Sequence, residues 1–346
     1  ETDRLVGGTD SPEAYEHFLR GHYLIQSTEG EALDRGLEEL RRAIAVDPGF
    51  ARAYADIADT LAQKVAYGQL DDVRLIGEAR TSAYTSVALA PDLSEAQTAV
   101  GTVAQYIDLD WEAADEAFQR AIALGPNSTT PFNRFSEFLS LTQRPQHSLD
   151  TGRAGLAIDP LDSGALHGVG IALLSLGRYE EAAEVFGEWN RYYPGSIWSY
   201  TKHALALSFA GRCEEAARQA AIADQRIAAA AFPLMDSWLA WGHAACGNQA
   251  GLAERRARIE AWVAENPDRF DPGIIYLAAI DGDVDAVVTQ LEGVLARRDP
   301  FLSFARLFSQ RLPGFGINGQ MEASERFQAF LDALDMPEPE PGVMFH

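Results

Sequence analysis

The chain has 346 residues, a formal net charge of −23 and a hydrophobic content of 47%, which is ample for a buried core. This acidity argues against nucleic acid as a partner, because nucleic-acid binding depends on Lys and Arg side chains at the phosphates. It argues equally against anionic membrane surfaces, and no apolar run approaches the roughly 20 residues that a membrane span needs. The negative charge fits a solvated outer face.

The chain begins with a polar stretch at residues 1–10, which we expect to be a linker. Ser11 and Pro12 then open a helix, because Ser is a preferred N-cap residue and Pro fits the first helical turn. A second pair of helices runs to Pro91, with a loop at 67–72 that is longer than usual. The first quarter of the chain is therefore expected to consist of paired helices.

Three further helix pairs follow at 94–126, 129–160 and 163–194. Asp110 is expected to cap the second helix of the first of these pairs. In the pair at 163–194, apolar residues recur three and four positions apart, which is the period of a helix with one buried face. These residues are Leu166, Val169, Leu173, Leu174, Ala182, Val185, Phe186 and Trp189.

The last third of the chain is less regular. A sixth and a seventh pair extend to Pro267, and an eighth covers about 272–298. We therefore assign 11–300 to one repeat region and 301–335 to a C-terminal helical cap. The tail at 336–346 is rich in Pro and is expected to be flexible.

Prolines close successive helix pairs at a nearly constant spacing. Their intervals are 43, 35, 34 and 34 residues, from the positions Pro48, Pro91, Pro126, Pro160 and Pro194. A residue before Pro is pushed out of the helical region, so each Pro ends a helix. A sustained interval near 34 residues is the period of tetratricopeptide repeats.

The pair at 163–194 carries the fuller repeat pattern. Gly170 lies in its first helix, Gly177 at its turn, Tyr179 and Phe186 in its second helix, and Pro194 at its end. In these features the chain resembles a tetratricopeptide repeat protein. The resemblance implies an all-α fold, a right-handed superhelical solenoid of about seven to eight helix-turn-helix repeats.

Longer strings carry a closer resemblance, over roughly residues 11–335. They are YEHFLRGHYLIQ near the start, IDLDWEAADEAFQRAIALGPNSTT in the middle and SERFQAFLDAL near the end. They are similar to the C-terminal repeat region of bacterial signalling proteins, in which a class III adenylate cyclase, a winged-helix regulator or a protein kinase lies upstream. The chain begins with Glu1 rather than Met, so we expect it to be part of a longer protein.

This resemblance implies a protein-protein interaction or regulatory module in bacterial signal transduction. Such a module would bind a peptide or partner protein in its concave groove and modulate an effector domain that this chain does not contain. One alternative is a stand-alone scaffold or adaptor. Another is a small-molecule sensor or enzyme that uses a cavity around His167 and His243.

Two motifs suggest ligand chemistry but fit structural roles better. The stretch 314–319 matches GxGxxG, but no strand precedes it, so we interpret it as a flexible loop. Residues 281–292 resemble a calcium loop, but Ala286 occupies the place that needs Gly, which favours helix capping by Asp283. No HExxH, Walker or CxxC motif is present. We therefore expect no enzyme activity, cofactor or metal site.

The concave face of the first helices is the better binding candidate, and it suits a protein or peptide. A clamp for terminal carboxylates is disfavoured, because the only lysines, Lys64 and Lys202, lie at other places of the repeat. Packing between helices remains an alternative role for the aromatic residues of this groove. The expected groove residues are Tyr15, Phe18, His22, Arg52, Asp59, Gln63, Thr98, Thr102, Gln105, Asn133, Glu137, His167, Trp198, Thr201, Asp236 and His243.

Compartment and assembly are less constrained. Cys213 and Cys246 fall at helix ends on the same side of a solenoid, so a disulfide is conceivable, although the sequence favours free buried thiols. A cytoplasmic location is expected, with a periplasmic one as the alternative. A homodimer is a further possibility.

Overall fold

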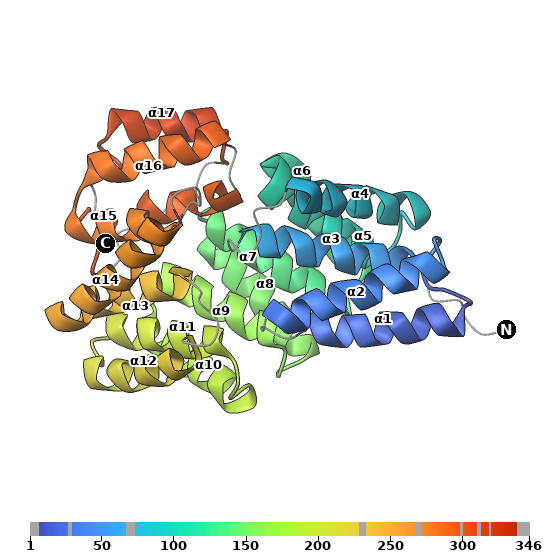
Figure 1. Cartoon of the computed structure of the whole chain (residues 1–346), viewed down its shortest axis with the longest axis horizontal. Helices are drawn as coiled ribbons and strands as arrows, with labels where there is room; N and C mark the ends of the chain where they lie inside the picture. The colour runs from blue at the N-terminus through green and yellow to red at the C-terminus, as the bar shows by residue number, and fades with distance from the viewer. Residues whose placement is uncertain are drawn as a thin grey trace. The chain divides into compact units, whose positions relative to one another are not determined.

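The computed structural model describes residues 7–26, 30–66, 73–227, 233–266, 271–297, 300–309, 313–317 and 320–337. Within these ranges the regular structure is helical and contains no β-strand (Figure 1). The all-α prediction is therefore confirmed. The chain divides into two compact units, Glu1–Phe135 (unit 1) and Ser136–His346 (unit 2).

Unit 1 contains three helix pairs, one π-helical segment and the start of a further helix. Its elements are α1 (Pro12–Ile25), α2 (Gly30–Val46), α3 (Ala51–Ala66), α4 (Val73–Leu89), α5 (Ser94–Val103), η1 (Ala104–Asp108), α6 (Trp111–Leu124) and α7 (Thr129–Leu141), which ends in unit 2. Helix α1 packs on α2, α3 on both α4 and α5, and α5 on α6.

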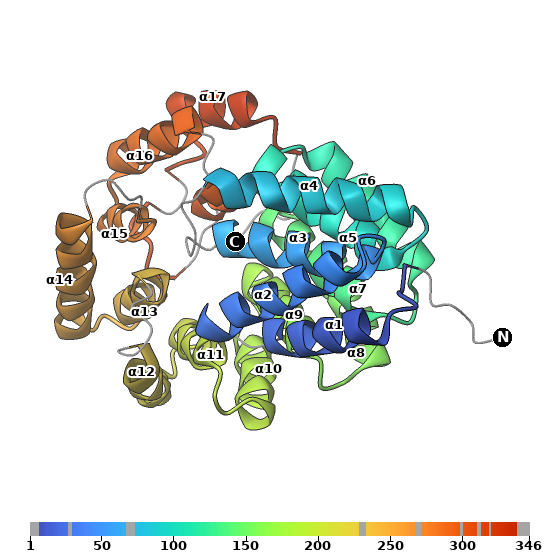
Figure 2. The ribbon, with the colours of Figure 1, turned by 45° about the vertical axis from the view of Figure 1, so that its right-hand side comes forward.

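Unit 2 continues with the same paired arrangement. Its elements are α8 (Pro145–Ile158), α9 (Ser163–Ser175), α10 (Tyr179–Tyr192), α11 (Ile197–Phe209), α12 (Cys213–Ile227), α13 (Pro233–Ala245), α14 (Gln249–Glu265), α15 (Gly273–Asp281), α16 (Val284–Arg297), the 3-10 helix η2 (Pro300–Ser309) and α17 (Glu325–Leu334). First helices of successive pairs contact one another, as α11 does with α13 and α13 with α15. Figure 2 shows α17 alongside α16, on which it packs.

The predicted helix starts are confirmed where capping residues define them. The Ser11 hydroxyl accepts a hydrogen bond from the backbone of Ala14, and Pro12 occupies the first turn. Asp110 accepts from the backbone N–H of Ala113 at 3.0 Å. Asp283 accepts from that of Ala286 at 2.9 Å, so this carboxylate caps α16, as expected. Each cap satisfies an N–H group that the helix itself leaves without a partner.

A left-handed residue marks the turn between the two helices of six successive pairs. The intervals between these residues are 34, 34, 34, 36 and 35, from the positions Leu109, Gln143, Gly177, Gly211, Gly247 and Gly282. Gly adopts a positive φ without steric cost, which explains four of the six. The turn residue therefore defines the repeat register more sharply than the closing prolines do.

The π-helical segment η1 explains why one proline interval is a residue longer than 34. A π-helix closes i→i+5 hydrogen bonds and so absorbs one extra residue within a helix. Gly101 lies eight residues before the turn residue Leu109, whereas Gly170 lies seven residues before Gly177. The inserted residue is thus absorbed inside the first helix, and the second helix keeps its place.

Glycine in a first helix makes room for an aromatic ring in the second. A Cβ atom on Gly170 would lie 2.3 Å from the ring of Phe186, and one on Gly101 would lie 2.7 Å from the ring of Phe118. Both rings are fully buried. The helix-weakening effect of glycine is offset because its missing side chain lets the two helices approach.

Two expectations from the sequence are wrong. The first concerns flexibility: the described part of the GxGxxG stretch, 314–317, is a loop as expected, but it packs against the fold. Phe315 and Ile317 are buried, and the backbone N–H of Gly316 donates to the carbonyl of Ala279 at 2.8 Å. The cysteines are not free thiols, because Cys213 and Cys246 form a disulfide with a Cα–Cα distance of 5.7 Å.

Some predicted segments lie outside the described residues. They are the first six residues of the expected linker, the loop at 67–72, and residues 318–319 and 338–346.

Candidate functional site

The first helices of unit 1 share a network of polar side chains, which we call the unit 1 polar face. It is contributed by α1, α3, α5 and the start of α7, and its members come from widely separated positions in the sequence. They are His22, Arg52, Asp56, Asp59, Gln63, Glu95, Thr102 and Arg134. All but Asp56, Glu95 and Arg134 were predicted as groove residues.

Asp59 is the centre of this face. Its carboxylate accepts hydrogen bonds from Gln63 Nε2 at 2.7 Å and from Thr102 Oγ1 at 2.8 Å. The guanidinium of Arg134 approaches both carboxylate oxygens, with Nε at 3.1 Å from Oδ1 and Nη2 at 3.0 Å from Oδ2. Two-point Arg–carboxylate pairs fix geometry as well as charge. Asp59 thus joins α3, α5 and α7 through the buried Thr102 and the half-buried Gln63 and Arg134.

Two ion pairs extend the network toward the N-terminus. His22 Nδ1 lies 2.7 Å from Asp56 Oδ2, and Arg52 Nη2 lies 3.2 Å from Glu95 Oε1. The hydrogen bond to Asp56 raises the pKa of His22. Burial raises the pKa of Asp56, and the bond to His22 opposes that rise. The face therefore presents both signs of charge within one stretch of first helices.

Other predicted groove residues of unit 1 are placed differently. Phe18 is buried and packs against Phe50 with ring centroids 4.8 Å apart, so packing between helices accounts for it. Tyr15 is 44% exposed. Thr98 is buried and donates to its own helix at Ser94 O. Gln105 is buried on η1, and Asn133 is half-buried on α7.

Unit 2 has a more aromatic first-helix surface. Trp198 of α11 meets Trp238 of α13 edge to face, with centroids 5.6 Å apart. The ammonium of Lys202 lies 3.2 Å from the centre of the Trp238 ring. Burial lowers the pKa of Lys202 to about 7, and the nearby Glu137 carboxylate limits the fall. Sequence reasoning missed Lys202, although its place one helical turn after Trp198 puts both on one face.

The remaining predicted residues of unit 2 are engaged inside the fold. Thr201 is buried and donates to Ile197 O. Asp236 pairs with Arg255 at 2.9 Å and with Arg258 at 3.2 Å. The His167 ring packs against Trp189, with centroids 5.6 Å apart, and the His243 ring pairs with the side chain of Asn248.

The segment 313–317 covers part of the first helices α13 and α15. The Phe315 ring stacks on Trp241 with centroids 4.3 Å apart and planes at 7°. Trp241 Nε1 donates to Pro313 O at 2.6 Å. A Cβ on Gly316 would lie 2.6 Å from Ile280 O, so only glycine lets the segment approach so closely.

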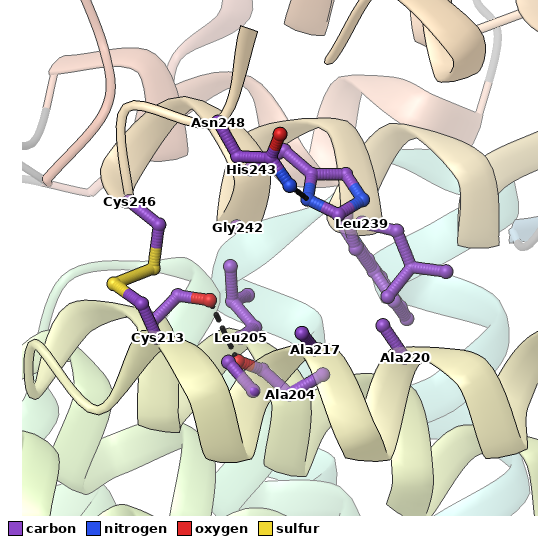
Figure 3. A pocket seen from close by; sticks show the side chains of 13 residues that line it. Ala204, Leu205, Cys213, Ala217, Ala220, Leu239, Gly242, His243, Cys246 and Asn248 are labelled. Carbon is purple, nitrogen blue, oxygen red and sulfur yellow. Dashed lines mark hydrogen bonds between the residues drawn. A yellow bond between two sulfur atoms is a disulfide. The ribbon is translucent and has the colours of Figure 1, made fainter. Parts of the chain in front are cut away.

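The disulfide lies beside a cavity of about 90 Å³ between α11, α12 and α13 (Figure 3). Burial lowers the pKa of His243, which lies on the cavity lining, whereas His167 does not belong to that lining. Across the described ranges, no group of three or more His, Cys, Asp and Glu side chains is placed to hold a metal ion. Nor does any helix in those ranges combine the length and the apolar character needed to cross a bilayer.

Comparison with known proteins gives one match in sequence. A 78-residue stretch is 40% identical to "Small glutamine-rich tetratricopeptide repeat-containing protein 2" of Mycosarcoma maydis. The match covers 22% of this chain and 22% of that protein, so the chain spans about a fifth of the length of the curated relative it matches. No protein-family model matches the chain.

Solved structures show similar folds at low identity. PilW, described as a widely conserved type IV pilus biogenesis factor, is 21% identical, covers 60% of this chain and 92% of its own, and has a TM-score of 0.48. A thermophilic repeat protein of Thermus thermophilus is 18% identical over 56% of this chain and 98% of its own, with a TM-score of 0.46.

The paired helices, the turn residue that recurs at intervals of 34 to 36 residues and the matched stretch agree with one another. The chain is therefore built from tetratricopeptide-like helix-turn-helix repeats.

Proposed function

We propose that the chain is a protein-interaction module that captures a segment of a partner protein on the unit 1 polar face. The observation that carries this proposal is the hydrogen-bonded network around Asp59, in which four side chains from three first helices hold one another in place. Side chains already fixed by one another lose little freedom on binding, so a partner meets a preorganised surface. The chemistry suits a polar segment that carries both signs of charge.

Peptide selection against the purified chain tests this proposal. A peptide from a displayed random library would be labelled, and its affinity measured for the wild type and for an Arg134→Gln variant. Loss of the two-point pair should weaken binding by about tenfold or more, since charge-assisted pairs contribute about 1.5–3 kcal/mol. The matched control is Arg120→Gln on the second helix α6, whose pair with Asp92 is exposed. If the Arg134→Gln and Arg120→Gln variants bind the peptide with equal affinity, the assignment of binding to the unit 1 polar face is overturned.

At a finer level, we propose that this capture regulates a larger bacterial signalling protein, as the sequence resemblance implies. Occupancy of the polar face would bias an effector domain encoded upstream of Glu1. The test is the activity of the full-length product with and without the selected peptide. A response that disappears in the Arg134→Gln variant supports regulation, and an unchanged activity favours a scaffold role.

For the compartment, we propose an oxidising one, which corresponds to the periplasmic alternative rather than to the cytoplasm. The chain has only two cysteines, and both are joined in one disulfide. Structural disulfides persist mainly outside reducing compartments. Thiol labelling in denaturant, with the cells lysed directly into the labelling reagent, would show no reactive cysteine if this is correct, and two reactive cysteines if it is not.

A further inference from the structure

The cavity between α11, α12 and α13 occupies a place that the third and fifth repeats fill with a phenylalanine ring. In the fifth repeat, Gly170 lies seven residues before the turn glycine Gly177, and Phe186 lies nine residues after it. The Phe186 ring fits against the bare backbone of Gly170. The same arrangement joins Gly101 and Phe118 in the third repeat.

The sixth repeat has small residues at both of these places. Counting from its turn glycine Gly211, the equivalent residues are Ala204 and Ala220. Both line the cavity of about 90 Å³, together with Ala216 and Gly242. The fourth repeat also has a small pair, Ser136 and Gly152, but there hydrogen-bonded serines close the space. The sixth repeat therefore keeps an opening where the fifth holds a ring.

The walls of this opening suit an apolar, aromatic occupant. Leu205, Trp238 and Leu239 also line the cavity, and the close view shows Leu205 and Leu239 beside Ala204 and Ala220 (Figure 3). Two polar side chains on the lining, Ser208 and Asn248, form hydrogen bonds within the chain. Ser208 donates to Ala204 O at 2.9 Å, and the Asn248 side chain donates to His243 while accepting from the backbone N–H of Gly251.

Access to the cavity is provided by its rim. Ala217 and Asn248 belong to the lining and are exposed to solvent. Apolar cavities in proteins stay dry and accept benzene, as an engineered cavity of about 150 Å³ does. The present cavity is smaller, but its rim is exposed to solvent. Its place in the repeat is the one that holds a phenyl ring in the third and fifth repeats.

From these observations we infer that the sixth repeat contains a binding site for a single six-membered aromatic ring, a role independent of partner capture on unit 1. The ring takes the place that Phe186 fills in the preceding repeat. Two sources share this chemistry: a free monocyclic aromatic molecule and a phenylalanine side chain.

Benzene is the probe for the first test, measured by ligand-observed NMR and by the thermal midpoint of the chain. The wild type should bind saturably at one site and melt at a higher temperature with benzene, because a ligand of the folded state stabilises it. No saturable binding to the wild type overturns the inference.

The matched variant rebuilds the ring of the fifth repeat in the sixth. Ala220→Phe is combined with Ala204→Gly to make room for the new ring. In the fifth repeat, a Cβ on Gly170 would lie only 2.3 Å from the Phe186 ring, and Ala204 occupies the place of Gly170. This double variant should lose benzene binding by about tenfold or more. Ala220→Leu provides a second, less demanding filling of the same space. Undiminished affinity in a folded filled variant places the benzene elsewhere and overturns the inference.

A gain-of-site variant and a second probe complete the experiment. Phe186→Ala opens the equivalent space in the fifth repeat, so benzene should then bind at two sites instead of one. N-acetyl-phenylalanine amide separates the two sources. If this compound binds the wild type but not the filled variant, the occupant of the cavity is a phenylalanine side chain. If benzene binds and this compound does not, the occupant is a free aromatic molecule.

Discussion

At the scale of single residues, Lys202 lies in an unusual environment for a lysine. It is 7% exposed and lies over the Trp238 ring. The pKa of Lys202 is lower in the folded state than in the unfolded chain, so protonation of this amine favours unfolding. Folding stability is therefore unaffected above about pH 10.5, falls as the pH drops toward 7, and levels off below 7.

The Lys202→Met variant should remove this cost. At pH 6 we expect its free energy of unfolding to exceed that of the wild type by about 3–5 kcal/mol, with little difference at about pH 10.5. Urea unfolding at the two pH values measures both quantities. Lys64→Met is the matched control, because Lys64 is also buried but pairs with the Asp34 carboxylate, and its loss should not stabilise the fold. A gain that does not depend on pH would contradict this account of Lys202.

Backbone conformation at the turns gives a second prediction at the same scale. Gly211 has a φ of 74° and open space around its Cα. Gly211→Ala should therefore lower the free energy of unfolding by about 1–2 kcal/mol through backbone strain alone. Gly77→Ala, also in open space but within α4, should raise it by about 0.5–1 kcal/mol. Chemical denaturation of both variants checks the opposite signs, and a shared sign would refute the assignment.

At the scale of helices, the packing of α9 on α10 depends on the match between Gly170 and Phe186. Gly170→Ala should gain slightly in helix propensity but lose about 1–3 kcal/mol through overpacking against the ring. Combining it with Phe186→Leu should recover part of that loss, since the shorter side chain leaves room for the methyl group. A double-mutant cycle in urea measures this coupling, and simple additivity of the two changes would argue against direct contact.

At the scale of the whole molecule, the disulfide ties α12 to the end of α13 across a separation of 33 residues. Crosslinking a loop of this length restricts the unfolded chain and is worth about 3–4 kcal/mol in the chain-entropy model. Replacing both cysteines by Ser should lower the free energy of unfolding by that order. The wild type treated with a reductant should match the double variant, and a wild type indifferent to reductant would show that the bond does not form.

Much of the fold is visible in the sequence because its signals are local. The 34-residue interval recurs along the chain, and the capping residues Ser11, Asp110 and Asp283 act on backbone N–H groups three residues away. Most residues on the unit 1 polar face were also predicted from their place in the repeat. Asp56, Glu95 and Arg134 were not predicted, and each of them pairs with a predicted residue on another helix.

Local signals alone specify the repeat type, the helix order and most helix starts, since proline, N-cap residues and apolar period act over a few residues. Contacts between repeats settle how Cys213 pairs and that 313–317 packs against α13 and α15. They also leave the space beside Ala220 open. These features depend on the distance between side chains from different repeats, which no local pattern specifies.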